Sequence, residues 1–216
     1  TIGEGGMGIV HRARHAMLRR PTAVKLLRPE RAGAAAIARF EREVRETARL
    51  SHPNTVTVFD YGRTPEGIFY YAMELLDGAT LDAILAVSGP LPPARVVHTL
   101  RQVAAALVEA HEAGLVHRDL KPSNIALCRQ GGVLDVAKVL DFGLVRDQSR
   151  TPVTEGPITG TPLYIAPETL SGQASPASDF YALGIVAYEL LVGEVPFKGK
   201  TVLEICAQHL DAPAPR

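Results

Sequence analysis

Cysteine is scarce in this chain, and the two cysteines, Cys128 and Cys206, show neither metal-ligand spacing nor a disulfide framework. We therefore expect a reducing, cytoplasmic setting. No apolar run reaches the roughly 18 residues that suggest a membrane span, and no signal peptide is recognisable. The formal net charge is zero, because 23 basic residues balance 23 acidic ones. Nothing in that balance favours a nucleic-acid or membrane partner. With 216 residues, the chain can bury a substantial core as one large domain or two small lobes.

Two short segments bring together side chains suited to phosphate chemistry, HRDLKPSN at 117–124 and DFG at 141–143. Asp119 could accept a proton from a hydroxyl group, and Lys121 could offset negative charge on a transferring group. Asn124 and Asp141 supply amide and carboxylate oxygens, the hard ligands that Mg²⁺ prefers. Each of these residues alone is more often an ordinary turn or cap residue, so the hypothesis depends on their combination.

Glycines at positions 3, 5 and 8 form a second candidate phosphate site near the start of the chain. A lone G-x-G-x-x-G is weak evidence, because the Rossmann dinucleotide turn has the same pattern and opens a helix. Here residues 9–15 alternate like a strand, and residues 22–27 form a second strand pattern. A glycine loop between two strands lets backbone amides approach phosphates without interference from side chains.

The combination matches the pattern H-R-D-L-x-x-x-N, with D-F-G downstream and A-P-E at 166–168. The chain therefore resembles the protein kinases, and more closely the bacterial Ser/Thr kinases of the eukaryotic type, over essentially its whole length. The resemblance implies an α+β, two-lobed fold. It comprises a small antiparallel β lobe with one helix over 1–73, a hinge over 74–78 and a larger, mainly helical lobe over 79–216. Because the family pattern extends past both ends, we expect a fragment truncated before the first strand and after helix G.

The resemblance implies transfer of the γ-phosphoryl group of ATP to Ser or Thr hydroxyls of proteins in bacterial signalling. Asp119 would orient and deprotonate the hydroxyl, Lys121 would contact the γ-phosphate, and Lys25 would hold the α- and β-phosphates. Mg²⁺, with Mn²⁺ as an alternative, would be held by Asn124 and Asp141. The implied catalytic residues are Lys25, Glu43, Asp119, Lys121 and Thr161.

Glu43 would pair with Lys25, although Glu41 and Glu46 are neighbouring candidates on the same helical pattern. Backbone groups of Glu74 and Leu76 would bind the adenine edge. The implied ATP-binding set is Ile2, Gly3, Gly5, Gly6, Gly8, Val10, Ala23, Lys25, Met73, Glu74, Leu76 and Ala126.

The remaining periodicities predict further helices and strands. We expect strands over 55–61, 68–74 and 136–140 and helices over 34–50, 93–113, 179–192 and 201–210. The helix over 93–113 carries a wide apolar face that includes Val97 and Val108, which predicts a buried helix. His111 and His117 offer too few ligands for zinc, so we interpret His117 as a packed structural histidine. Asp179 resembles the family's buried aspartate, which holds the catalytic loop from beneath.

Residues 144–165 form a polar stretch too long for a simple connection. Arg118 and Arg146 would together bind a phosphorylated threonine on this stretch, most favourably Thr154, with Thr159 and Thr151 as lesser candidates. The alternative is that both arginines pair with nearby carboxylates and the segment needs no modification.

Two other functions remain as alternatives. A pseudokinase acting as a scaffold would lack a phosphate or metal residue, and none is missing; a small-molecule kinase would lack the segment before A-P-E. Inactivity of the isolated fragment is also left open. The expected partners are ATP and protein substrates, without nucleic acid. A kinase–kinase dimer for autophosphorylation and a membrane link through a segment outside the chain are left open.

Overall fold

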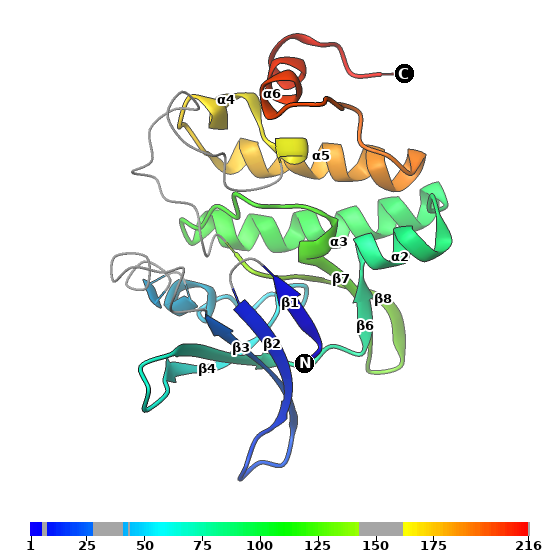
Figure 1. Cartoon of the computed structure of the whole chain (residues 1–216). Helices are drawn as coiled ribbons and strands as arrows, with labels where there is room; N and C mark the ends of the chain where they lie inside the picture. Colours follow the sequence, from blue (N-terminus) through cyan, green and yellow to red (C-terminus); the bar gives the residue numbers. More distant parts are fainter. Residues whose placement is uncertain (6–7, 28–40, 43, 143–161, 216) are drawn as a thin grey trace.

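A computed structural model of the chain describes residues 1–5, 8–27, 41–42, 44–142 and 162–215. Strands form a small lobe, drawn at the bottom of Figure 1, and helices form a larger lobe above it. No helix in these ranges is long and apolar enough to cross a membrane. The architecture is the two-lobed α+β fold that the motifs predict.

The small lobe is a five-stranded antiparallel sheet in the order β1-β2-β3-β5-β4. Its strands are β1 (Gly3–Gly5), β2 (Gly8–Arg14), β3 (Pro21–Leu27), β4 (Val58–Arg63) and β5 (Phe69–Glu74). In β3 every second residue from Ala23 to Leu27 is buried, as expected where alternate side chains enter a core. Residues 41–42 and 44–47 are helical and belong to the helix predicted over 34–50. Its other predicted residues up to 40 lie outside the described ranges.

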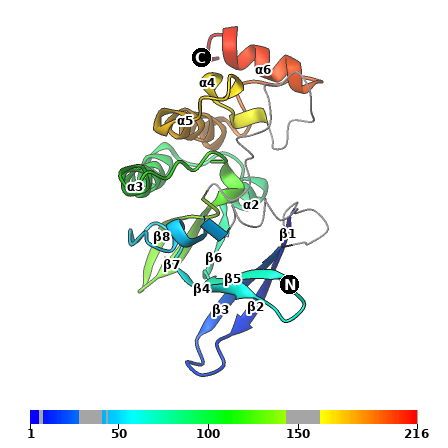
Figure 2. The same cartoon turned by 90° about the vertical axis from the view of Figure 1, so that its left-hand side faces the viewer.

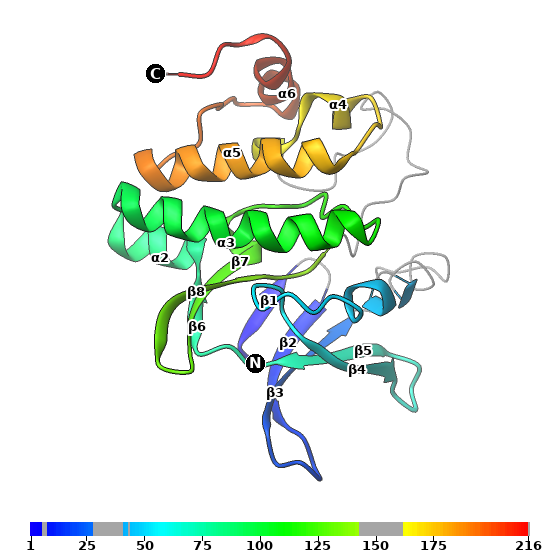
Figure 3. The same ribbon diagram turned by 180° about the vertical axis from the view of Figure 1, so that it is seen from behind.

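The large lobe is organised around two long helices, α3 (Pro93–Glu112) and α5 (Pro176–Val192), which lie side by side in Figures 1 and 3. α5 begins at a capping box made by Ser175 and Ser178 and ends at Gly193, whose φ of 90° suits a left-handed cap. The other helices are α2 (Leu81–Ser88), the short α4 (Pro167–Leu170), and α6 (Val202–Asp211). The apolar sides of α3 and α5 share one core, which includes the fully buried Val96, Val103, Leu107, Val186 and Leu190.

A second, three-stranded antiparallel sheet lies between the long helices and the small lobe (Figure 2). Its strands are β6 (Gly78–Thr80), β7 (Ile125–Gln130) and β8 (Val133–Val139). A single 3-10 turn, η2 (Pro122–Asn124), ends the HRDLKPSN stretch at 117–124, called the catalytic segment below, and leads into β7. Because Ile125 pairs with Val139, the β7–β8 hairpin brings the catalytic segment beside the residues that follow β8. The fold thus places the two candidate phosphate-chemistry segments next to each other.

Several element boundaries differ from the sequence prediction. β4 begins at Val58 rather than at residue 55, because Thr55 forms an isolated parallel bridge with Val139. β8 begins at Val133, three residues earlier than predicted, because pairing with β7 extends it to the hairpin turn. The predicted helix over 179–192 begins at Pro176, where proline is tolerated in the first turn.

The predicted apolar face of α3 was too wide. Val97 is 57% exposed and Val108 is 49% exposed, whereas Val96, Val103 and Leu107 are buried. A helix packed on one side buries only a stripe of its surface, so apolar residues beside that stripe stay in contact with solvent.

Candidate active site

A buried carboxylate holds the catalytic segment from beneath. Asp179 on α5 is 1% exposed and accepts hydrogen bonds from the backbone N–H of His117 at 2.7 Å and of Arg118 at 2.8 Å. The Nε2 atom of His111 on α3 lies 2.8 Å from the same carboxylate. Arg118 has a φ of 65°, a left-handed conformation that is uncommon for a non-glycine residue. The main-chain bonds to Asp179 help to fix this conformation, as the resemblance predicts.

His117 connects the catalytic segment to the residues that follow β8. Its side chain is fully buried, its Nε2 lies 2.9 Å from the carbonyl oxygen of Leu140, and its ring packs 4.9 Å from the Phe142 ring. The backbone N–H of Leu140 in turn donates to the carbonyl oxygen of Asn124 at 2.9 Å. His117 is therefore a packed structural histidine, as predicted, and it fixes the spacing of the two segments.

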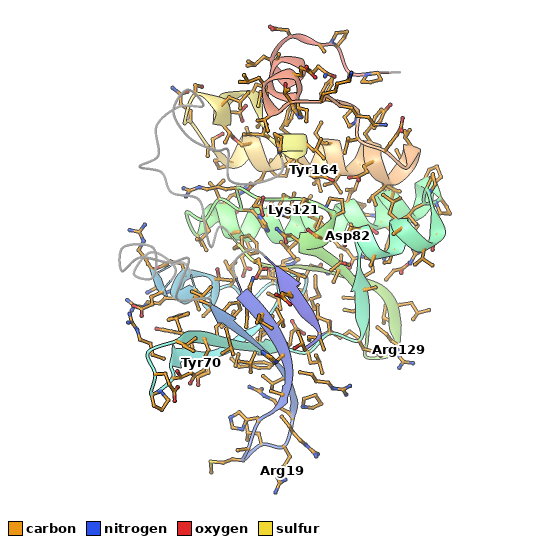
Figure 4. The ribbon with its side chains drawn as sticks, in the orientation of Figure 1. Arg19, Tyr70, Asp82, Lys121, Arg129 and Tyr164 are labelled. Atoms are coloured by element: carbon orange, nitrogen blue, oxygen red, sulfur yellow. The ribbon has the colours of Figure 1, made fainter. Side chains whose placement is uncertain are left out.

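The side chains of the catalytic segment converge on Asp119. Lys121 Nζ lies 2.7 Å from Asp119 Oδ2. Asn124 donates from Nδ2 to the Asp119 carbonyl oxygen at 2.8 Å and to Asp119 Oδ2 at 3.2 Å. With its amide nitrogen held in this way, Asn124 has its amide oxygen as the atom that could bind a metal. Figure 4 labels Lys121 in the large lobe, at the level of α3.

Asp141 receives two donors from the small lobe. Lys25 Nζ on β3 lies 2.6 Å from Oδ2, and the Tyr71 hydroxyl on β5 donates to Oδ1 at 2.5 Å. Burial acts to raise the pKa of Asp141, but the Lys25 ammonium and the hydrogen bonds from Lys25 and Tyr71 lower it below its ordinary value. Burial and the neighbouring Asp141 charge raise the pKa of Tyr71 well above its ordinary value, so its hydroxyl stays protonated and donates.

Asp141 also has a left-handed backbone, with a φ of 51°. Non-glycine residues in this region carry local strain, and such residues cluster at functional sites. The strand that ends just before Asp141 and the two donors to its carboxylate hold the side chain in place. The site therefore presents a fixed carboxylate between the two sheets.

Sequence reasoning did not find Tyr71. Its role depends on the pairing of β3 with β5, which places Tyr71 opposite Lys25, with the lysine ammonium 5.9 Å from the centre of the tyrosine ring. Lys138 was missed for a similar reason. Its ammonium lies 2.8 Å from Glu74 Oε1, and the lysine side chain is 3% exposed. Neither pairing is visible before the sheet register is known.

The predicted adenine-binding residues come from β2, β3, β5 and β7, from Ile2 just before β1, and from the segment after β5. Ala23 is buried and pairs with Met73 across β3 and β5, while Ala126 is buried on β7 opposite Thr80. Val10 lies opposite Lys25, and the Ile2 N–H donates to the Val10 carbonyl oxygen at 2.9 Å. Leu76 follows two residues after β5 and is half-buried. Their contacts with a nucleotide remain a proposal.

Gly8 has a structural reason for its identity besides phosphate binding. A Cβ atom at this position would lie 2.2 Å from the Leu26 carbonyl oxygen on the paired strand β3. Gly3 and Gly5 lie in β1 and pair with Val10 and Gly8. Some predicted residues lie outside the described ranges, namely Gly6, Glu43, Arg146, Thr154, Thr159 and Thr161.

The oxygens of Asn124 and Asp141 suit a hard divalent cation. No group of three or more His, Cys, Asp or Glu side chains that could hold a metal occurs among the described residues. Mg²⁺ is commonly bound by only one or two protein ligands together with substrate phosphates and water. The donor set therefore fits Mg²⁺ that arrives with a nucleotide.

Comparison with known proteins agrees with this geometry. The family model "Protein kinase domain" matches residues 1–214. PknL, a serine/threonine-protein kinase of Mycobacterium tuberculosis, is 43% identical over 218 residues, which cover 100% of this chain and 53% of PknL. PrkC, a serine/threonine-protein kinase of Bacillus subtilis, is 39% identical over 218 residues, which cover 100% of this chain and 33% of PrkC.

A crystal structure of Rad53 in complex with AMP-PNP superposes with a TM-score of 0.79 and 28% identity, covering 96% of this chain and 50% of the Rad53 chain. The chain thus spans about half the length of PknL and about a third of that of PrkC. The chain belongs to the protein kinase family.

Proposed function

We propose that the protein transfers the γ-phosphoryl group of ATP to serine or threonine hydroxyls of other proteins. The observation that carries this proposal is the convergence of Asp119, Lys121, Asn124 and Asp141 on loops tied to buried anchors. Phosphoryl transfer needs little covalent chemistry from the protein, so positioning and charge stabilisation supply most of the catalysis. Lys121 and Asn124 are held by hydrogen bonds to Asp119, and Asp141 is held by Lys25 and Tyr71, so the arrangement meets that need.

Asp119 is the group that orients the attacking hydroxyl. As the hydroxyl oxygen bonds to the γ-phosphorus and the bond to ADP breaks, the hydroxyl proton passes to the Asp119 carboxylate. Lys121, which lies 2.7 Å from that carboxylate, offsets negative charge on the transferring group. Backbone amides of the glycine segment and the Lys25 ammonium bind the nucleotide phosphates.

Asn124 and Asp141 would hold Mg²⁺, which would offset the negative charge of the nucleotide phosphates. In the structure, Lys25 Nζ lies 2.6 Å from Asp141 Oδ2. Binding of ATP offers the ammonium a phosphate partner and, in the family pattern, Glu43. We propose that Lys25 exchanges partners in this way.

Labelled ATP, Mg²⁺ and a generic basic protein substrate test the proposal. Asp119→Asn should reduce transfer by at least a hundredfold while leaving nucleotide affinity and the melting curve close to wild type. Lys25→Met should weaken nucleotide binding as well as transfer. Phosphoamino-acid analysis should find phosphoserine or phosphothreonine. If Asp119→Asn turns over at a near-normal rate, the role assigned to that carboxylate is wrong.

Phosphorylation of the 144–165 segment is a further part of the proposal, with Thr154 as the main site and Thr159 as the next. A phosphothreonine adds about −1.5 to −2 charge and three acceptor oxygens, which Arg118 and Arg146 would bind. A kinase–kinase dimer would allow one copy to modify the other in the cytoplasm, where ATP is available. Mass spectrometry after incubation with ATP should find phosphate here, and Thr154→Ala should lower turnover at least tenfold; full activity of unmodified protein would exclude the switch.

A further inference from the structure

The Tyr71 hydroxyl is placed by the core of the small lobe. The tyrosine side chain lies in β5, is 2% exposed, and packs with Leu27, Val44 and Phe69. Its hydroxyl reaches Asp141 Oδ1 at 2.5 Å, within the short range typical of an O–H donor bonded to a carboxylate. The aromatic ring is thus held on several sides by apolar residues, and the hydroxyl is directed at a proposed metal ligand.

The two oxygens of Asp141 have donors of different kinds. Oδ2 is bound by the Lys25 ammonium, a charged group on a long flexible chain. Oδ1 is bound by a neutral hydroxyl on a rigid ring with few rotatable bonds. In the proposed function the ammonium moves to nucleotide phosphates, and Oδ2 then loses its donor. Tyr71 has no such role with phosphate, because packing keeps its ring beside Asp141.

We propose that Tyr71 is a positioning residue for Asp141: it fixes Oδ1 so that Oδ2 becomes the oxygen available to the divalent cation. The inference rests on the proposed kinase function. It also accounts for the left-handed backbone of Asp141, φ 51°, because a fixed carboxylate keeps a strained residue in one conformation. A carboxylate ligand without such a partner would rotate more freely. Metal binding would then have to restrict that rotation, and the entropy cost would lower the metal affinity.

A plain structural role for Tyr71 makes a different prediction. Buried tyrosines usually find some hydrogen-bond partner for the hydroxyl, and loss of that bond lowers stability without a particular effect on a metal. A partner that orients a metal ligand, by contrast, typically changes metal affinity by about 10- to 100-fold when it is removed. The two roles therefore separate when metal dependence is measured apart from folding and nucleotide affinity.

The experiment measures ADP binding by calorimetry across a Mg²⁺ titration, using wild type, Tyr71→Phe and Tyr70→Phe below the melting transition of each. Tyr70 is the matched control. Tyr70 neighbours Tyr71 on β5. Its hydroxyl oxygen lies beside Gly62, 3.2 Å from the position that a Cβ atom on Gly62 would take. Figure 4 labels Tyr70 on the sheet, away from α3.

For Tyr71→Phe we expect the Mg²⁺ concentration at half-maximal stimulation of ADP binding to rise about 10- to 100-fold. Affinity for ADP without Mg²⁺ should change less than about threefold, and Tyr70→Phe should match wild type in both measurements. An unchanged Mg²⁺ midpoint in Tyr71→Phe would overturn the inference while leaving the proposed function intact. Equal losses with and without Mg²⁺ would also overturn it. If wild type binds ADP without any Mg²⁺ dependence, the proposed function and this inference both fail.

Discussion

Replacement of Asp179 tests how far the catalytic loop depends on its buried anchor. Asp179→Ala removes the acceptor for the N–H groups of His117 and Arg118 and the partner of His111 Nε2. Hydrogen bonds to a charged group contribute about 1.5–3 kcal/mol each, and an unsatisfied buried N–H costs about 1–3 kcal/mol. These contributions do not add fully, because the loop can relax. We expect the free energy of unfolding to fall by about 3–5 kcal/mol, similar to the effect of removing one partner from a buried charged network.

Urea unfolding monitored by circular dichroism gives the stability, and steady-state transfer assays give the activity. Turnover should fall about 100-fold even where the protein is fully folded, because relaxation of Arg118 displaces Asp119. Asp179→Asn keeps one acceptor oxygen and should lose roughly half as much stability. Asp211→Asn, at the exposed end of α6, is the matched control and should stay within about 0.5 kcal/mol of wild type. A loss below about 1 kcal/mol for Asp179→Ala would refute the reasoning.

Two other substitutions follow from the described contacts. Gly8→Ala should destabilise the protein by about 1–3 kcal/mol, because its Cβ atom would lie 2.2 Å from the Leu26 carbonyl oxygen; an unchanged melting temperature would contradict this. Burial raises the pKa of Glu189; the hydrogen bond that Tyr164 donates at 2.6 Å opposes the shift, and the Asp82 charge adds to it. A raised folded-state pKa means that this carboxyl favours the folded state below its unfolded pKa and loses that contribution as pH rises. Glu189→Gln, which keeps an acceptor for Tyr164, should therefore raise the urea midpoint at pH 7.5, with a difference that shrinks towards pH 4; a pH-independent difference would argue against the assignment.

Much of the site could be predicted from the sequence because it is local. Asp119, Lys121 and Asn124 lie within six consecutive residues, and a 3-10 turn followed by a strand suffices to bring their side chains together. His117 was interpreted as a structural histidine because the region offers too few ligands for zinc, whereas its carbonyl partner, Leu140, is 23 residues away in the sequence. Local spacing constrains geometry when few backbone angles intervene.

Contacts between distant strands could not be predicted in this way. Tyr71 and Asp141 are 70 residues apart, and their hydrogen bond depends on the register of β3 with β5 and on the placement of one sheet against the other. The strand pattern over 68–74 predicts burial but does not identify the partner of a hydroxyl group. The predicted width of the buried face of α3 was wrong for a related reason, because the exposure of Val97 depends on which helices cover α3.

The division of the site between the lobes gives Asp141 a particular place in the mechanism. The large lobe supplies Asp119, whose segment is anchored on Asp179. The small-lobe sheet supplies Lys25 and Tyr71, which both bind Asp141 at the end of a segment that follows β8. A rotation of one lobe relative to the other changes the distances from β3 and β5 to Asp141 but leaves the hydrogen bonds around Asp119 intact. Under the proposed function, metal ligation through Asp141 would therefore be more sensitive to lobe placement than proton acceptance by Asp119.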